Sequence, residues 1–118
     1  MNLEEKIKAL SRQLELNFCK IKDKIQVYDE EQYFIYGNAA YLVLTEEEAD
    51  AKWEDTLNSY IEECILPELP EHFINYFDEE KWKRDARCDG RGHALARYDG
   101  NEYEQQVDGV WYYIYRTD

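Results

Sequence analysis

The sequence predicts an α+β fold in which about three helices pack on an antiparallel sheet. Apolar residues recur at helical spacing in an N-terminal and a central segment, and turn-bounded segments of β-forming residues follow each of these parts. This order of helix, strands, helices and strands is typical of α+β proteins. The length of 118 residues fits one compact domain. We therefore expect residues 1–118 to fold as a single acidic α+β domain.

The N-terminal segment, residues 2–25, is predicted to form one helix. Its apolar residues step by three and four along the chain, which places them on one face of a helix. They are Leu3, Ile7, Leu10, Leu14, Phe18, Ile21 and Ile25.

Residues 33–44 are rich in β-branched and aromatic residues, which favours strand. Gly37-Asn38 divides the segment and predicts a turn between two short strands. One longer strand with a glycine bulge is the alternative.

The segment 45–64 is predicted to form a second helix, and it is strongly acidic. Thr45 and Glu48 match the T-x-x-E capping box, and acids in the first turn complement the helix dipole. Its expected apolar face consists of Ala49, Trp53, Leu57, Tyr60, Ile61 and Cys64. Dipole complementarity ends after the first turn, so it does not explain Glu54, Asp55, Glu62 and Glu63.

Pro67 and Pro70 should end the second helix, because proline cannot donate a backbone hydrogen bond. A third helix is expected within residues 70–87, with apolar contacts from Phe73, Ile74, Phe77 and Trp82.

Three Asp-Gly pairs, at 89–90, 99–100 and 108–109, punctuate the C-terminal part. Asp-Gly is a strong hairpin-turn signal, so the segments between and after these pairs are predicted to form a β-meander. The last strand carries rings on both faces, which suits either a central strand or an exposed edge.

The charge is unevenly distributed along the chain. The net charge is −13, and residues 29–80 hold sixteen acids and a single base, Lys52. In the other two parts the acids and bases nearly balance: the net charge is +2 for residues 1–28 and zero for residues 81–118. The expected partner-binding residues are Asp29, Glu30, Glu31, Glu46, Glu47, Glu48, Asp50, Glu54, Asp55, Glu62, Glu63, Asp78, Glu79 and Glu80.

This charge excludes some partners and favours others. Phosphates repel an acidic chain, so we expect neither direct contact with nucleic acid nor binding to an anionic membrane. A basic protein is the natural complement, and strong like charge favours a monomer. Three cysteines at wide spacing imply no disulfide framework, and the N-terminus has no signal-peptide pattern. We therefore expect a cytoplasmic protein.

Candidate catalytic and metal-binding residues are few. Cys88, Asp89 and His93 lie close in "CDGRGH", with His72 as a further ligand, but their spacing matches no zinc pattern. A buried cysteine beside a turn is the preferred interpretation. An enzyme would require a pocket that joins Cys88 or Ser59 to a histidine, and no motif indicates one. We predict no enzyme activity, no cofactor and no metal.

Two resemblances suggest a function. The segments "AYLVLTEEEAD", "DGRGHALARYDGNEYE" and "YYIYR" look like parts of small phage and mobile-element proteins, a family without an established function. In length, acidity and charge layout the chain also resembles small bacterial DNA-mimic proteins that bind the histone-like protein HU. That resemblance implies a monomer whose acidic surface occupies the DNA-binding face of HU, at the bacterial nucleoid.

The sequence thus predicts a DNA mimic that competes with DNA for a basic DNA-binding protein, HU favoured. The 45–64 segment supports this, because its net charge of −7 over about 30 Å of helix is of the order of DNA's charge density. A phage-type inhibitor of a nuclease or host-defence complex is the alternative in the same class. An acidic domain without mimicry is the third interpretation, in which the carboxylates scatter in space.

Overall fold

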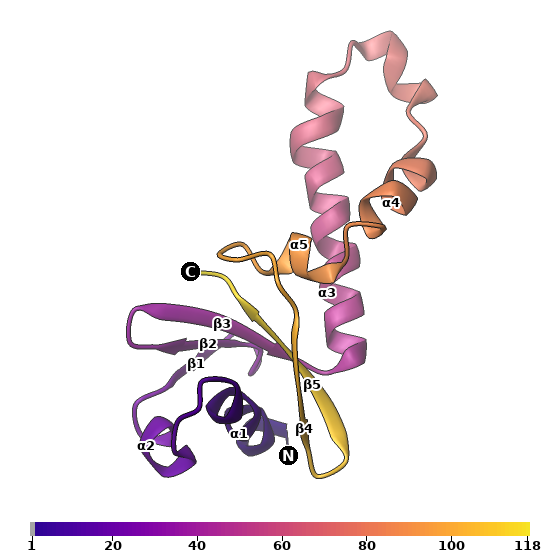
Figure 1. The fold of residues 1–118 in the computed structure, drawn as a ribbon. Coiled ribbons are helices and arrows are strands. Elements are labelled where there is room, and N and C mark those ends of the chain that lie inside the picture. Colours follow the sequence, from indigo (N-terminus) through magenta and orange to yellow (C-terminus); the bar gives the residue numbers. More distant parts are fainter. Residues whose placement is uncertain (1) are drawn as a thin grey trace.

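The central sheet has five antiparallel strands in the order β1-β2-β3-β5-β4 (Figure 1). The computed structural model describes residues 2–118. The strands are β1 (Gln26–Tyr28), β2 (Tyr33–Tyr36), β3 (Ala39–Leu44), β4 (Tyr103–Val107) and β5 (Val110–Arg116). β5 pairs with both β3 and β4, so the ring-bearing last strand is central and not an edge. The predicted α+β class with an antiparallel sheet is confirmed.

Helices cover both faces of the sheet. On one face α1 (Asn2–Gln13) and α2 (Phe18–Lys22) bury a core that includes Leu10, Tyr112 and Ile114. On the other face α3 (Glu46–Tyr60) and α5 (Arg91–Leu95) pack over Leu44 and Tyr115. Alternating β5 side chains point to opposite faces, which explains why this strand has no polar face.

The prediction of one continuous helix over residues 2–25 is wrong, because the helix ends at Gln13 and a second one begins at Phe18. Glu15 adopts a positive φ of 58°, and the backbone N–H of Leu16 reaches back to the carbonyl of Ser11 at 2.8 Å. This is a Schellman motif with glutamate where glycine is usual. Asn17 then caps α2 by accepting a hydrogen bond from the N–H of Cys19.

The predicted β2–β3 hairpin is confirmed. Tyr36 pairs with Ala39, and Gly37 has a φ of 62°, as a tight two-residue turn requires. The sequence did not indicate β1, which joins β2 through a turn in which Asp29, Glu30 and Glu31 all have positive φ.

The predicted capping box is confirmed at the start of α3. The Thr45 side chain accepts from the N–H of Glu48, and the Glu48 side chain accepts from the N–H of Thr45. The helix continues as a π-helical segment, η1 (Ile61–Ile65), and then as a 3₁₀ turn, η2 (Leu66–Glu68). The expected third helix divides into a 3₁₀ helix, η3 (Glu71–Tyr76), and α4 (Glu79–Arg87).

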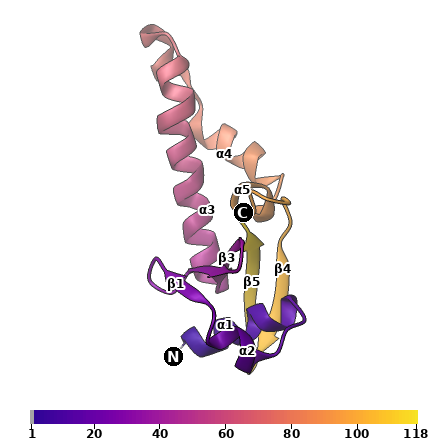
Figure 2. The ribbon, with the colours of Figure 1, turned by 90° about the vertical axis from the view of Figure 1, so that its left-hand side faces the viewer.

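Residues 53–88, here called the arm, stand away from the sheet as a helical hairpin (Figures 1 and 2). The distal half of α3 forms one limb and α4 lies in the other. The arm makes the molecule long, with extents of 57 × 28 × 24 Å. The radius of gyration is 16.7 Å, against about 13–14 Å expected for a compact chain of this length.

The expected C-terminal meander is wrong in its first strand, because residues 91–95 form the helix α5. Gly92 allows this helix to pack closely, since a Cβ atom there would lie 2.8 Å from the carbonyl oxygen of Gly100. The last Asp-Gly pair does form the predicted hairpin turn, with φ of 52° at Asp108 and 82° at Gly109.

Candidate functional site

The fourteen predicted binding residues occupy three parts of the fold. Asp29, Glu30 and Glu31 form the β1–β2 turn, and six acids lie along α3. The other five lie at the end of the arm or at the start of α4: Glu62, Glu63, Asp78, Glu79 and Glu80. The acids of α3 do not all point one way, and ion pairs divide the fourteen into two groups.

The first group includes Glu46 and Asp50, which share one arginine. Nη1 of Arg91 lies 2.7 Å from Glu46 and 3.0 Å from Asp50. Nε of the same arginine lies 2.8 Å from Glu102. Hydrogen bonds from Tyr113 and then Arg91 hold the pKa of Glu46 below its usual value. These contacts tie the start of α3 to α5 and to the sheet.

Glu48 is compensated by a buried lysine. Nζ of Lys6 is 2.8 Å from Oε1 of Glu48 and donates to the carbonyl oxygen of Glu31 at 2.9 Å. Lys6 is only 1% exposed. Burial raises the pKa of Glu48, but hydrogen bonds from Lys6, the Thr45 N–H and Gln32 outweigh it and lower the pKa overall.

Glu54 and Glu79 pair with cations of α4. Nζ of Lys83 lies 2.8 Å from Glu54 and 3.4 Å from Glu79, and Arg87 also contacts Glu54. Hydrogen bonds from Lys83 first, and Arg87 second, lower the pKa of Glu54. A stacked pair, Tyr60 and Trp82, joins the same two limbs with ring centroids 5.5 Å apart. Complementarity to the helix dipole did not explain Glu54. Its ion pairs now give it a structural role, which is to hold the two limbs of the arm together.

The second group has no ion pair to another side chain of residues 2–118 within 4 Å. Its nine members are Asp29, Glu30, Glu31, Glu47, Asp55, Glu62, Glu63, Asp78 and Glu80. Within residues 2–118 no ion pair compensates their negative charge, which leaves it available to a partner. We call them the free carboxylates.

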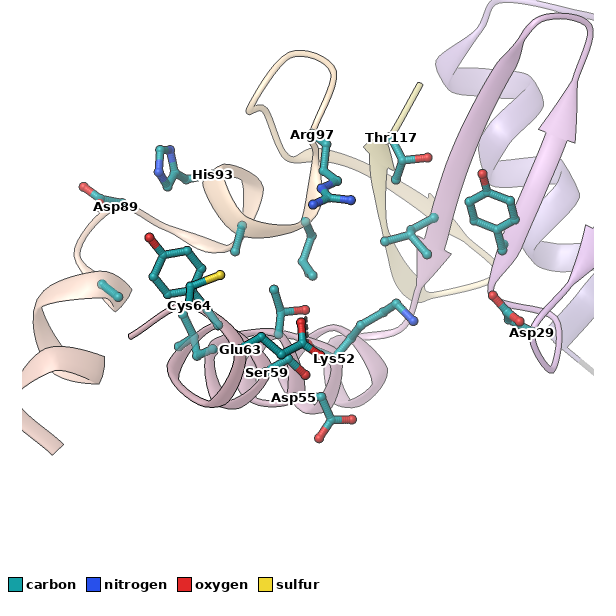
Figure 3. Close-up of a pocket in the computed structure, with 18 of the residues that line it drawn as sticks. Asp29, Lys52, Asp55, Ser59, Glu63, Cys64, Asp89, His93, Arg97 and Thr117 are labelled. Atoms are coloured by element: carbon teal, nitrogen blue, oxygen red, sulfur yellow. Dashed lines mark hydrogen bonds between the residues drawn. The ribbon is translucent and has the colours of Figure 1, made fainter. Parts of the chain in front are cut away.

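Three free carboxylates border one groove, which runs along α3 (Figure 3). The groove has a volume of about 970 Å³. Asp55 and Glu63 belong to its lining on the α3 limb, where the carboxylate of Asp55 points outward, and Asp29 lines it from the β1–β2 turn. Asp89 and Asp118 add two more acids, against two strong bases, Lys52 and Arg97. The groove is therefore acidic overall.

The end of the arm departs from the sequence prediction. Phe73 and Ile74 were expected to supply apolar contacts, but they are 51% and 38% exposed. Tyr76, which the sequence did not single out, is 82% exposed. Phe77 and Trp82 are half-buried. The apolar character of these residues could not predict their exposure, because the same sequence pattern is found in buried helix faces and in exposed interaction surfaces.

Ser59, Cys64 and His93 line the acidic groove together, whereas Cys88 and His72 are not among the residues that line it. Cys88 was expected to be buried, but it is exposed, as are Cys19 and Cys64. The turn predicted beside it is present, and Gly90 has a φ of 88°. Within residues 2–118 no group of three histidine, cysteine or acidic side chains has the arrangement of a metal site.

No helix in the described part of the chain is both long and apolar enough to cross a bilayer. Comparison of the chain with protein-family models, with curated proteins and with solved structures gave no match.

Proposed function

We propose that this protein binds a basic DNA-binding protein through its free carboxylates and competes with DNA for that protein. HU is the partner we favour, on the resemblance in size, acidity and charge layout. Binding occludes the basic surface of the partner and breaks no covalent bond. This function belongs to a monomer in the bacterial cytoplasm, at the nucleoid through its partner.

One observation carries the proposal: the acidic groove gathers free carboxylates from separate parts of the chain. Asp55 and Glu63 lie about two helical turns apart on the arm, and Asp29 lines the same groove from the β1–β2 turn. Several like charges around one concave surface strengthen the local field and attract a cationic partner.

The scaffold beneath these carboxylates supports the same function. α3 begins at a complete capping box, and its core-facing residues Ala49 and Leu57 are buried. The Glu54 ion pairs fix α4 against it. A scaffold ordered before binding loses less conformational entropy on association, which favours affinity for a given set of charges.

Competition with DNA tests the proposal. Purified HU and labelled duplex DNA are mixed with the protein over a salt series from about 50 to about 200 mM. The triple variant Asp55→Lys, Glu62→Lys, Glu63→Lys should weaken competition about tenfold or more at low salt, because three attractive charges become repulsive. A matched control, Glu15→Lys, Asp23→Lys, Glu104→Lys, makes the same change in net charge outside the acidic segment.

The control should compete nearly as well as the wild type. An equal loss of competition in the two triple variants would mean that only net charge matters, and it would refute the free carboxylates as the binding surface. If the wild type binds no basic protein at low salt, the proposed function itself is wrong. Capture of a nuclease or defence complex from bacterial lysate at low salt, with no binding to HU, favours the phage-type inhibitor.

A further inference from the structure

The end of the arm presents an apolar cluster that packing within the chain does not use. All six residues of η3 are exposed, and three of them are large and apolar: Phe73, Ile74 and Tyr76. The other large exposed apolar residues stand singly in the sequence, apart from the adjacent pair Val110 and Trp111, whereas these three fall within four consecutive positions. Large apolar side chains gathered in this way are typical of interaction sites.

The geometry of the arm explains why these side chains stay in solvent. The contacts that join its limbs lie nearer the sheet: Glu54 with Lys83 and Arg87, and Tyr60 with Trp82. Beyond them the chain turns at the far end of the arm (Figure 2). Pro70 precedes η3 and Asp78 caps α4, which leaves η3 as a short 3₁₀ connection between the limbs.

Acidic residues flank this cluster along the chain. We call residues 61–80 the arm tip; it contains seven acids and no lysine or arginine. They are Glu62, Glu63, Glu68, Glu71, Asp78, Glu79 and Glu80. A second copy of this chain is a poor occupant, because two tips in contact would bring fourteen carboxylates together. The complementary surface is an apolar pocket with lysine or arginine at its rim.

We propose that the arm tip inserts Phe73 and Tyr76 into an apolar pocket rimmed by basic residues on the protein that the acidic groove binds. The identity of that protein rests on the proposed function. Aromatic side chains enclosed by polar rims supply a large share of the affinity of protein interfaces. DNA offers a phosphate field but no such side chains, so the tip would give the protein a contact that its competitor lacks.

The salt dependence of binding tests the aromatic residues of the tip separately from the free carboxylates. The double variant Phe73→Ser, Tyr76→Ser should bind HU about tenfold or more weakly, with an unchanged slope of log Kd against log salt. The charge-reversal triple variant should instead reduce that slope, because it removes ionic contacts. Tyr28→Ser, Trp111→Ser is the matched control, since both of these aromatic residues are exposed on the sheet, and it should bind as the wild type does.

The outcomes separate the two proposals. If the wild type binds HU and the tip variant binds equally well, the tip inference is wrong and the proposed function stands. If the wild type binds no basic protein, both fail. Sedimentation of the free protein provides a further check: a concentration-dependent dimer that the tip substitutions abolish would show that the tip binds a second copy, which overturns the inference.

Discussion

Glu54 and Lys83 form an ion pair of 2.8 Å between the two limbs of the arm. Arg87 contacts the other oxygen of the same carboxylate, so one acid of α3 fixes two successive turns of α4. The next residue along α3, Asp55, has no ion pair within residues 2–118 and lines the acidic groove. Two adjacent acids on one helix therefore have different roles: one holds the arm together and the other carries free charge.

The Glu54→Gln variant should loosen the arm, because the ammonium of the buried Lys83 then has one ionic partner, the more distant Glu79, in place of two. Hydrogen exchange measured by mass spectrometry should show faster exchange in α4 and unchanged exchange in the sheet. Asp55→Asn is the matched control, one residue away with the same change of charge. Equal exchange in the two variants would show that the Glu54 pairs do not hold the limbs together.

Acid should weaken the fold through Glu46, Glu48 and Glu54. Each has a pKa below its ordinary value of 4.5. A carboxylate with a depressed pKa in the folded state stabilises the fold above pH 4.5, and that contribution disappears as the pH falls through the folded-state pKa. Urea unfolding from about pH 7 to about pH 3 should therefore show the stability difference between wild type and Glu48→Gln shrinking below pH 4.5. A constant difference over this range would contradict the assignment.

Alkali should weaken the fold through Tyr112 and Tyr115. Burial raises the pKa of both hydroxyls above the ordinary value of 10.0, and hydrogen bonds to Glu5 and Glu102 raise them further. A group with a raised pKa contributes its full stabilisation below the unfolded pKa, so stability should fall as the pH rises beyond 10. Denaturant titrations at rising pH check this. The Tyr112→Phe variant should lose less stability than the wild type above pH 10, and an equal loss would exclude Tyr112 as a cause.

Gly92 is required by close packing, and Gly100 is required by backbone conformation. A Cβ atom on Gly92 would lie 2.8 Å from the Gly100 carbonyl oxygen, so Gly92→Ala should destabilise the fold by about 1–3 kcal/mol through steric conflict. Gly100 has open space around it but a φ of +71°, so Gly100→Ala should cost about 1–2 kcal/mol through strain. Crystal structures of the two variants distinguish the causes: α5 should shift only in Gly92→Ala, and an unmoved α5 there would contradict the packing argument.

Local signals predicted local structure well. Gly37-Asn38 gave the β2–β3 turn and Thr45 with Glu48 gave the start of α3, because each depends only on residues a few positions apart. The break after Gln13 was missed, since Glu15 occupies a left-handed position that usually holds glycine.

The compensation of acids could not be predicted in the same way. The cations that pair with Glu46, Glu48 and Glu54 lie far along the chain, and only the fold brings them close. A charge count located the acidic segment but could not separate its structural carboxylates from its free ones. The exposure of Phe73 and Tyr76 likewise depends on the arm standing away from the sheet.

The buried Lys6 of α1 and the half-buried Glu48 of α3 form an ion pair between these two helices. Lys6→Met should destabilise the fold by about 3 kcal/mol, at the low end for a broken buried pair, because Glu48 is partly solvated and keeps its contacts with Gln32 and the Thr45 N–H. The double variant Lys6→Met, Glu48→Gln should recover part of that loss, since the unpaired charge is then gone. Denaturant unfolding of the wild type, both single variants and the double variant gives the coupling energy. Additive losses would mean that the two residues act independently and that the acidic start of α3 is not anchored through α1.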